Sequence, residues 1–137
     1  VASALAGGLL ACQTVDLGTP PSDINACRPS QQYFIDEIWP NVLNKDYGGK
    51  TCADAKCHDP GSGRPLTLVP PRDPGAIPLP PEWAANYRSA SEQMNCSNVT
   101  SSELLVLPTG QRVHGGGTLF SLTDPEAGKI QMWVTAP

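Results

Sequence analysis

In the first half of the chain stands Cys52-Ala53-Asp54-Ala55-Lys56-Cys57-His58. Two cysteines close together, with a histidine directly after the second, are the pattern by which a c-type haem is attached to protein. Two thioether bonds fix the porphyrin edge, and the imidazole that follows is then placed beneath the iron as its proximal ligand. The motif therefore predicts haem c, held covalently by Cys52 and Cys57 with His58 on the iron. The usual pattern has two residues between the cysteines and this chain has four, so a small disulfide loop or half of a zinc site stays open as an alternative.

A second group of residues, far along the chain, gives the motif a context. It comprises Ser102-Glu103-Leu104-Leu105, Pro108-Thr109-Gly110, His114-Gly115-Gly116-Gly117, Phe120, Asp124-Pro125, Ile130 and Trp133. With these residues the chain resembles the single-haem c-type cytochrome domains of secreted planctomycete and myxobacterial proteins. The resemblance covers about residues 30–137, and the proline-rich middle matches poorly. It implies the cytochrome c fold, a helical shell around one haem in which the first and last helices pack against each other.

The chain contains two histidines, and the second, His114, precedes the last predicted helix. The resemblance implies that His114 is the distal iron ligand, because the loop before the last helix faces the open side of the iron in that architecture. The three glycines that follow His114 would let the backbone approach a flat ligand closely. Met94 and Met132 are the alternative distal ligands, since His/Met ligation is common in cytochromes c and raises the reduction potential.

Apolar periodicity predicts a mainly α-helical domain with long Pro/Gly-rich loops. Ser30 is expected to cap a helix in which Phe34, Ile38 and Val42 form one apolar face. Pro40 predicts a kink or an early end of that helix, because it has no N–H to donate to Asp36. Further predictions are an irregular segment over residues 59–81, a helix from 81 towards 94, a short apolar run over 102–107, and a final helix that Asp124 caps with Pro125 in its first turn.

The N-terminal stretch of residues 1–11 is uncharged and ends at Leu9-Leu10-Ala11-Cys12. It resembles the end of a bacterial lipoprotein signal, in which the cysteine carries the lipid after cleavage. We therefore expect a signal remnant over 1–11, a lipid-anchored tether over 12–29 and the cytochrome c-like domain over 30–137. This interpretation places the protein in the cell envelope, as a periplasmic or outer-membrane lipoprotein whose contact with the membrane is the lipid anchor alone. The alternative for residues 1–11 is a buried helix.

Cysteine parity agrees with this scheme. If Cys12 carries lipid and Cys52 and Cys57 hold haem, then Cys27 and Cys96 are left as a pair, and an exported protein meets an oxidising compartment. A disulfide closing the loop between them would stabilise the fold by roughly 4 kcal/mol in the chain-entropy model.

Composition limits the function. The 137 residues suffice for one domain, and a net charge of -4 argues against a nucleic-acid partner. The sequence His114-Gly115-Gly116-Gly117 also occurs in esterases, but the Gly-x-Ser-x-Gly elbow they need is absent from this sequence. The sequence therefore predicts an electron carrier rather than an enzyme, working with a redox protein that the sequence does not identify. The alternatives are a haem-free, disulfide-stabilised interaction module and a zinc protein using Cys52, Cys57 and histidine.

Overall fold

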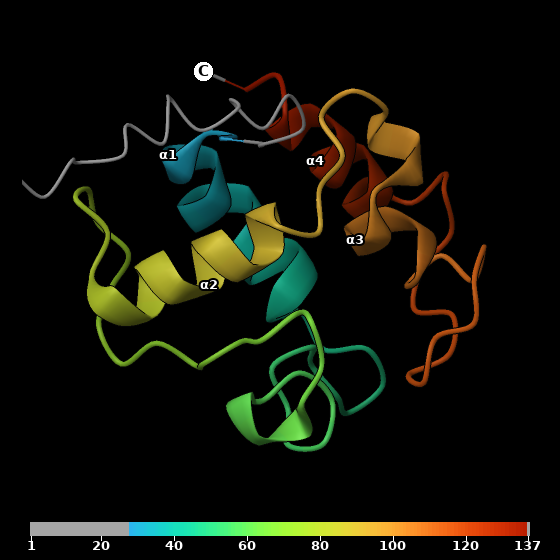
Figure 1. Ribbon diagram of the computed structural model, residues 1–137, viewed down its shortest axis with the longest axis horizontal. Helices are drawn as coiled ribbons and strands as arrows, with labels where there is room; N and C mark the ends of the chain where they lie inside the picture. Colours follow the sequence, from blue (N-terminus) through green and yellow to red (C-terminus); the bar gives the residue numbers. More distant parts are fainter. Residues whose placement is uncertain (1–27, 137) are drawn as a thin grey trace, which may run out of the picture.

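The computed structural model describes residues 28–136, and this part of the chain is mainly helical, with no strand in it. The fold class predicted from periodicity is thereby confirmed at the level of mainly α structure. The elements run α1 (Gln31–Tyr33), η1 (Phe34–Leu43), η2 (Pro60–Ser62), α2 (Pro81–Ser91), η3 (Val99–Ser101), α3 (Glu103–Val106) and α4 (Pro125–Trp133), joined by long loops (Figure 1). The predicted lipid site Cys12, the tether and Cys27 lie outside the described residues.

The first helix begins where the sequence predicts. The hydroxyl of Ser30 accepts a hydrogen bond from the Tyr33 N–H at 3.2 Å, and α1 continues directly into η1. The early end expected at Pro40 is wrong, because η1 continues to Leu43 as a π-helix. The Asn41 side-chain amide donates to the carbonyl of Asp36 at 3.5 Å, and the Asn44 N–H reaches back to Trp39 at 2.8 Å. A carbonyl that Pro40 leaves without an N–H donor thus finds another partner.

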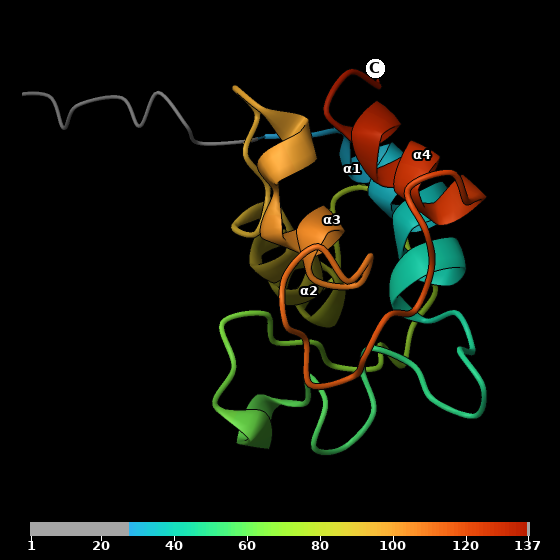
Figure 2. The same cartoon turned by 90° about the vertical axis from the view of Figure 1, so that its right-hand side faces the viewer.

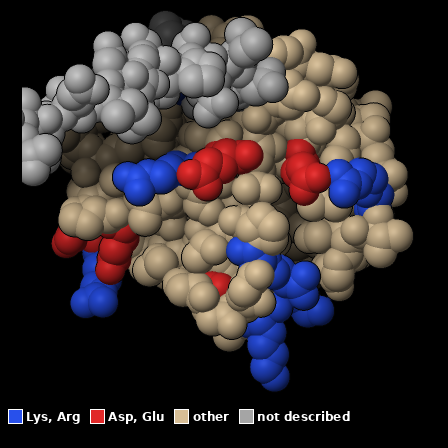
Figure 3. Space-filling model, in the orientation of Figure 1, with Lys and Arg blue, Asp and Glu red and all other residues tan. Residues whose placement is uncertain are grey.

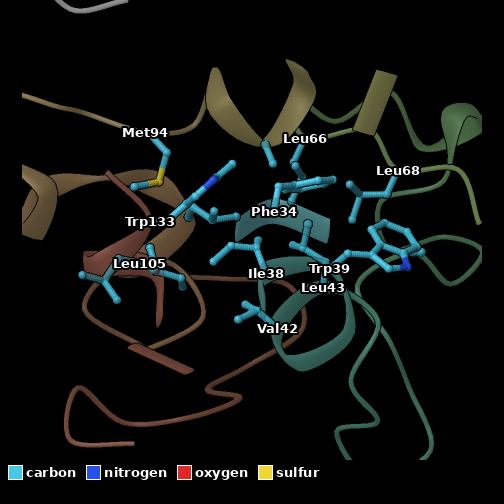
Figure 4. Packing of buried hydrophobic residues seen from close by; sticks show 14 of the residues in the cluster. Phe34, Ile38, Trp39, Val42, Leu43, Leu66, Leu68, Met94, Leu105 and Trp133 are labelled. Atoms are coloured by element: carbon cyan, nitrogen blue, oxygen red, sulfur yellow. The ribbon is translucent and has the colours of Figure 1, made fainter. Parts of the chain in front are cut away.

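Aromatic side chains from three helices form the centre of the core. Phe34 of η1 lies between Trp83 and Tyr87 of α2 and Trp133 of α4, with ring centres 6.3, 5.6 and 5.5 Å away. Edge-to-face and tilted pairs at these distances add to the gain from burial. Trp133 is fully buried, and its indole N–H donates to the carbonyl of Ser30 at 2.9 Å (Figure 4). The helix at each end of the described chain is therefore fixed to the other.

Two ion pairs reinforce the packing of α4 on η1, which lie side by side in Figure 2. Lys129 of α4 pairs with Glu37 of η1, and Lys45, just after η1, pairs with Glu126 at the start of α4. Glu126 is 5 % exposed, so its carboxylate depends on Lys45 for compensation. Much of the remaining surface has neither acidic nor basic side chains (Figure 3), as the 16 % charged composition requires.

Side chains of α2 hold the proline-rich segment in place. The segment has no regular structure between η2 and α2, as predicted. Asn86 is fully buried and makes two reciprocal bonds with Val69: its amide donates to the Val69 carbonyl at 2.6 Å and its oxygen accepts the Val69 N–H at 2.7 Å. Ser89 accepts the Thr67 N–H at 2.7 Å. Backbone groups that proline-rich sequence cannot pair in a helix or sheet are satisfied in this way.

The last helix begins where the sequence predicts but has a different cap. Asp124 occupies the N-cap position and Pro125 the first turn, yet the Asp124 carboxylate accepts from the Ser121 N–H at 2.7 Å instead of from the helix. Ala127, Ile130 and Trp133 are buried, and Val134, just after the helix, is half-buried. Of the helices within residues 28–136, none combines the length and the apolar character that crossing a bilayer requires.

Candidate haem site

The cysteine motif forms a compact turn after η1. The Asp54 carboxylate accepts the Thr51 N–H at 2.8 Å, and the Asp54 carbonyl accepts the Cys57 N–H at 2.9 Å. Lys56 has a left-handed backbone, with φ of 71°, and its N–H donates to Asp59. The two extra residues between the cysteines are therefore taken up inside a hydrogen-bonded loop.

His58 is held through three hydrogen bonds. Its backbone N–H donates to the carbonyl of Cys52 at 3.1 Å, and its carbonyl accepts the Leu68 N–H at 2.7 Å. Its ring Nδ1 lies 3.0 Å from the carbonyl oxygen of Leu66. A carbonyl oxygen only accepts, so Nδ1 carries the proton and Nε2 is the nitrogen left with a lone pair. A metal-binding histidine is oriented by such a bond from its other ring nitrogen.

Burial lowers the pKa of His58 below its ordinary value of 6.5. The hydrogen bond to Leu66 opposes that shift, and the nearby His114 and Arg64 lower the pKa further. The neutral imidazole is therefore favoured, and this is the form that binds metals.

His114 is held in the same manner from the other side. Its Nδ1 lies 3.0 Å from the carbonyl oxygen of Gly117, and the Gly117 N–H donates to the His114 carbonyl at 2.9 Å. Nδ1 is again the donor to a carbonyl, so Nε2 is the ring nitrogen that this bond leaves free. The loop that bears His114 reaches from α3 down to the loops that follow η1 in both ribbon views (Figures 1 and 2).

The two imidazoles lie opposite each other. Their ring centres are 6.1 Å apart and their planes differ by 16°. The rings are therefore near-parallel and stacked. Two imidazoles that share one metal ion, with metal–nitrogen bonds of about 2.0–2.1 Å, would place their ring centres about 6.3 Å apart. The observed distance between the ring centres is close to that value.

Searches with the chain found no matching family model, no similar curated protein and no similar solved structure.

A cleft extends to both sides of the histidine pair. Its inner part encloses about 790 Å³ and its outer part about 640 Å³, both counted out to the open mouth. The two parts share Cys52, His58, Arg64, His114, Gly115 and Leu119. The inner wall is mainly apolar and is formed by Val42, Leu43, Pro65, Leu66, Leu104, Leu107, Pro108, Val113, Leu119 and Phe120. A flat, largely apolar group crossed by the axis between two imidazoles suits this shape.

The outer part of the cleft carries basic side chains. Cys57, Lys50, Lys56 and Arg64 line it, and basic side chains gather over this lower end of the molecule in Figure 3. The inner part thus suits a porphyrin ring, and the outer cations suit the carboxylates that porphyrins carry.

Both motif cysteines are free thiols that face the cleft. Cys52 lines both parts, and its Sγ lies 3.9 Å from the carbonyl of Val42. Burial raises the pKa of Cys52 from 9.0 to about 12, and the charges of Cys57 and Asp54 add to the shift. A pair of reduced thiols beside a histidine pair fits the donor set that covalent haem requires.

The alternative distal ligands lie away from this cleft. Met94 is buried in the hydrophobic core (Figure 4), and Met132 lies on α4 with 59 % of its surface exposed. Neither lines the cleft. Residues 28–136 contain no group of three or more His, Cys, Asp or Glu that could hold a metal ion.

Cys96 is disulfide-bonded. Its expected partner, Cys27, lies outside the described residues, so the pairing of these two stays a prediction.

Sequence reasoning missed the groups that orient the two histidines. The Leu66 and Gly117 carbonyls belong to the backbone, so the type of residue at these positions does not reveal them. Arg64 and Asn86 were also missed, although Arg64 lines the cleft and Asn86 anchors the segment that carries Leu66. A buried asparagine next to a proline-rich loop was the one available signal, because such a side chain satisfies irregular backbone.

Proposed function

We propose that this chain is a single-haem c-type cytochrome that carries electrons. Cys52 and Cys57 would hold the haem, and His58 and His114 would bind its iron on opposite faces. The observation that carries the proposal is the histidine pair. Two imidazoles 6.1 Å apart, each with Nδ1 bonded to a carbonyl, lie between two halves of one cleft beside two free thiols.

Electron transfer is the function that the two proposed iron ligands favour. A bound haem supplies a one-electron couple. With histidine on both faces of the iron, as proposed, no position would be left for a substrate, and electron transfer through the edge of the haem would remain. The mainly apolar wall of the inner part would keep water from the ring, and Lys50 and Lys56 line the outer part. A second histidine in place of methionine favours a lower reduction potential.

The cytochrome c-like architecture is part of the proposal. It is supported by the packing of α4 against η1 and by the histidine loop that lies between α3 and α4. We further propose export to the cell envelope and anchoring through lipid on Cys12, which rest on the residues of the N-terminal stretch.

Intact mass and optical spectra of the exported protein test the proposal. Expression in a host with haem-attachment machinery should give a red protein whose mass includes one haem, with a pyridine haemochrome spectrum of the c type. A colourless chain with a Cys52–Cys57 disulfide would support the haem-free interaction module instead. Zinc without iron would support the zinc site. Either result would overturn the cytochrome proposal.

Matched variants assign the roles. Cys52→Ala and Cys57→Ala should each leave haem on one thioether, whereas Ala55→Ser, an exposed change in the same turn, should leave attachment intact. His114→Ala should convert the iron from low spin towards high spin. The exposed neighbour Gln111→Ala, on the same loop, serves as its control. A low-spin spectrum unchanged in His114→Ala would remove His114 from the site.

A further inference from the structure

We infer that Gly116 and the backbone carbonyl of Gly117 are positioning groups that hold His114 in its ligand orientation, while Gly115 has no part in this. The inference rests on the proposed function and concerns how the second imidazole is presented. It assigns separate roles to three consecutive, identical residues.

The histidine loop is closed at its base by hydrogen bonds. The Leu119 N–H donates to the carbonyl of Pro108 at 2.7 Å, and the Phe120 N–H reaches the same oxygen at 3.4 Å. Phe120 is buried and packs against Tyr47 in a tilted arrangement, with ring centres 5.9 Å apart. The ends of the loop are therefore fixed to the core, and the orientation of His114 depends on the few residues around it.

Gly116 leaves the space that the imidazole occupies. A β-carbon on Gly116 would lie 3.1 Å from Cε1 of His114 and 3.5 Å from its Nδ1. The first distance is shorter than ordinary van der Waals contact, so the ring would have to move by a few tenths of an ångström. The ring is bonded at Nδ1, and its Cε1 lies between Nδ1 and Nε2, so any such movement also shifts Nε2.

Gly117 fixes the other edge of the ring. Its carbonyl oxygen accepts from Nδ1 of His114 at 3.0 Å, which sets the tautomer and the tilt of the imidazole. Its φ of 76° is in the left-handed region, where a side chain is strained. An alanine at this position would relax towards negative φ and turn the carbonyl away from Nδ1.

A β-carbon on Gly115 would meet the Arg64 guanidinium at 3.7 and 3.9 Å, which is ordinary contact, and Gly115 is not in the left-handed region, so it does not fix the His114 ring. Because Gly115 lines the cleft, the matched control is Gly128 of α4, which lines neither part of it. A β-carbon on Gly128 would have nothing within 4 Å, and its backbone is not left-handed either. Gly128→Ala therefore makes the same chemical change away from the cleft.

The test compares Gly116→Ala, Gly117→Ala and Gly128→Ala with the parent, all as haem-loaded full chains. The apparent affinity of the iron for added imidazole is measured by spectrophotometric titration, because it scales with the fraction of molecules in which His114 is off the iron. We expect about a fivefold gain in affinity in Gly116→Ala and Gly117→Ala, the size of effect that strain in one side-chain torsion produces. Gly128→Ala should match the parent.

Each outcome bears on the inference. Equal affinity in all three variants and the parent would overturn it, as would a gain in Gly128→Ala as large as that in Gly116→Ala. Far-UV circular dichroism and covalent haem content check that each variant folds. Recovery of the low-spin spectrum on saturation with imidazole shows that His58 is intact. If Gly116→Ala does not accumulate, the comparison of Gly117→Ala with Gly128→Ala decides. A parent that contains no haem would overturn the proposed function itself, whereas a low-spin parent with unresponsive variants would overturn this inference alone.

Discussion

Replacement of Asn86 by alanine should destabilise both the fold and the site, although Asn86 does not line the cleft. Its fully buried amide holds Val69 through bonds of 2.6 and 2.7 Å. Three residues before Val69 is Leu66, whose carbonyl orients His58, and Leu68 donates to the His58 backbone. Asn86 therefore connects α2 to the segment that fixes the proximal histidine.

The expected loss of stability follows from the backbone groups of Val69 that lose their partners. Asn86→Ala leaves one N–H and one carbonyl of Val69 without partners, and each such group costs about 1–3 kcal/mol when buried. Val69 is half-buried, so water replaces part of the lost bonding and the lower half of that range applies. We expect a loss of about 2–4 kcal/mol in the free energy of unfolding. For a chain of this size, that loss corresponds to a fall of roughly 10 °C in Tm.

Urea and thermal unfolding of the full chain measure this loss. Asn44→Ala is the matched control, because Asn44 is exposed at the end of η1, and it should change stability by less than about 0.5 kcal/mol. The haem-loaded Asn86→Ala protein should also bind added imidazole more readily, as His58 loses orientation. A change of less than about 1 kcal/mol in Asn86→Ala would refute the reasoning that these two bonds hold the segment.

Three further predictions concern the core, an ion pair and alkaline pH. Trp133→Ala should cost about 3–5 kcal/mol in unfolding experiments because the side chain is fully buried, whereas its exposed neighbour Met132→Ala should cost less than about 0.5 kcal/mol. Lys45→Ala should cost about 1–2 kcal/mol in the free energy of unfolding, because it leaves the buried Glu126 carboxylate uncompensated. A double-mutant cycle with Glu126→Gln measures the coupling energy of this pair. Arg72→Ala, which removes a more exposed ion pair with Glu82, is the control and should have an effect near zero. In the haem-free chain, the pKa of Cys52 is raised from 9.0 to about 12 by burial, so the unfolded state releases the thiol proton first and stability should fall as pH rises from about 9 towards 12. Cys52→Ala should flatten that decline in unfolding experiments run across this pH range, and a decline of equal slope in both chains would contradict the assignment.

Local sequence signals predicted the helices well. Ser30 begins the first helix, Pro81 and Pro125 occupy the first turns of α2 and α4, and the i, i+4 series from Phe34 is buried as expected. Capping residues and apolar periodicity act within a few residues, so they can be recognised without knowledge of the fold. Of the two outcomes predicted at Pro40, the early end is wrong: the helix continues in a π-helical register, and the Asn41 side chain reaches the Asp36 carbonyl.

For the candidate site, too, the sequence predicts one part and the folded structure determines the other. The sequence alone identifies the two cysteines, His58 and His114 as the residues with the right chemistry, because ligand type is a property of side chains. It left Met94 and Met132 open, since their distance from His58 depends on how helices pack. The tertiary structure places His114 opposite His58 and takes both methionines elsewhere. It also supplies the Leu66 and Gly117 carbonyls, which every residue type carries and which only the folded chain directs at a histidine ring. The sequence therefore determines which side chains can act as ligands, whereas their orientation depends on contacts between segments that lie far apart along the chain.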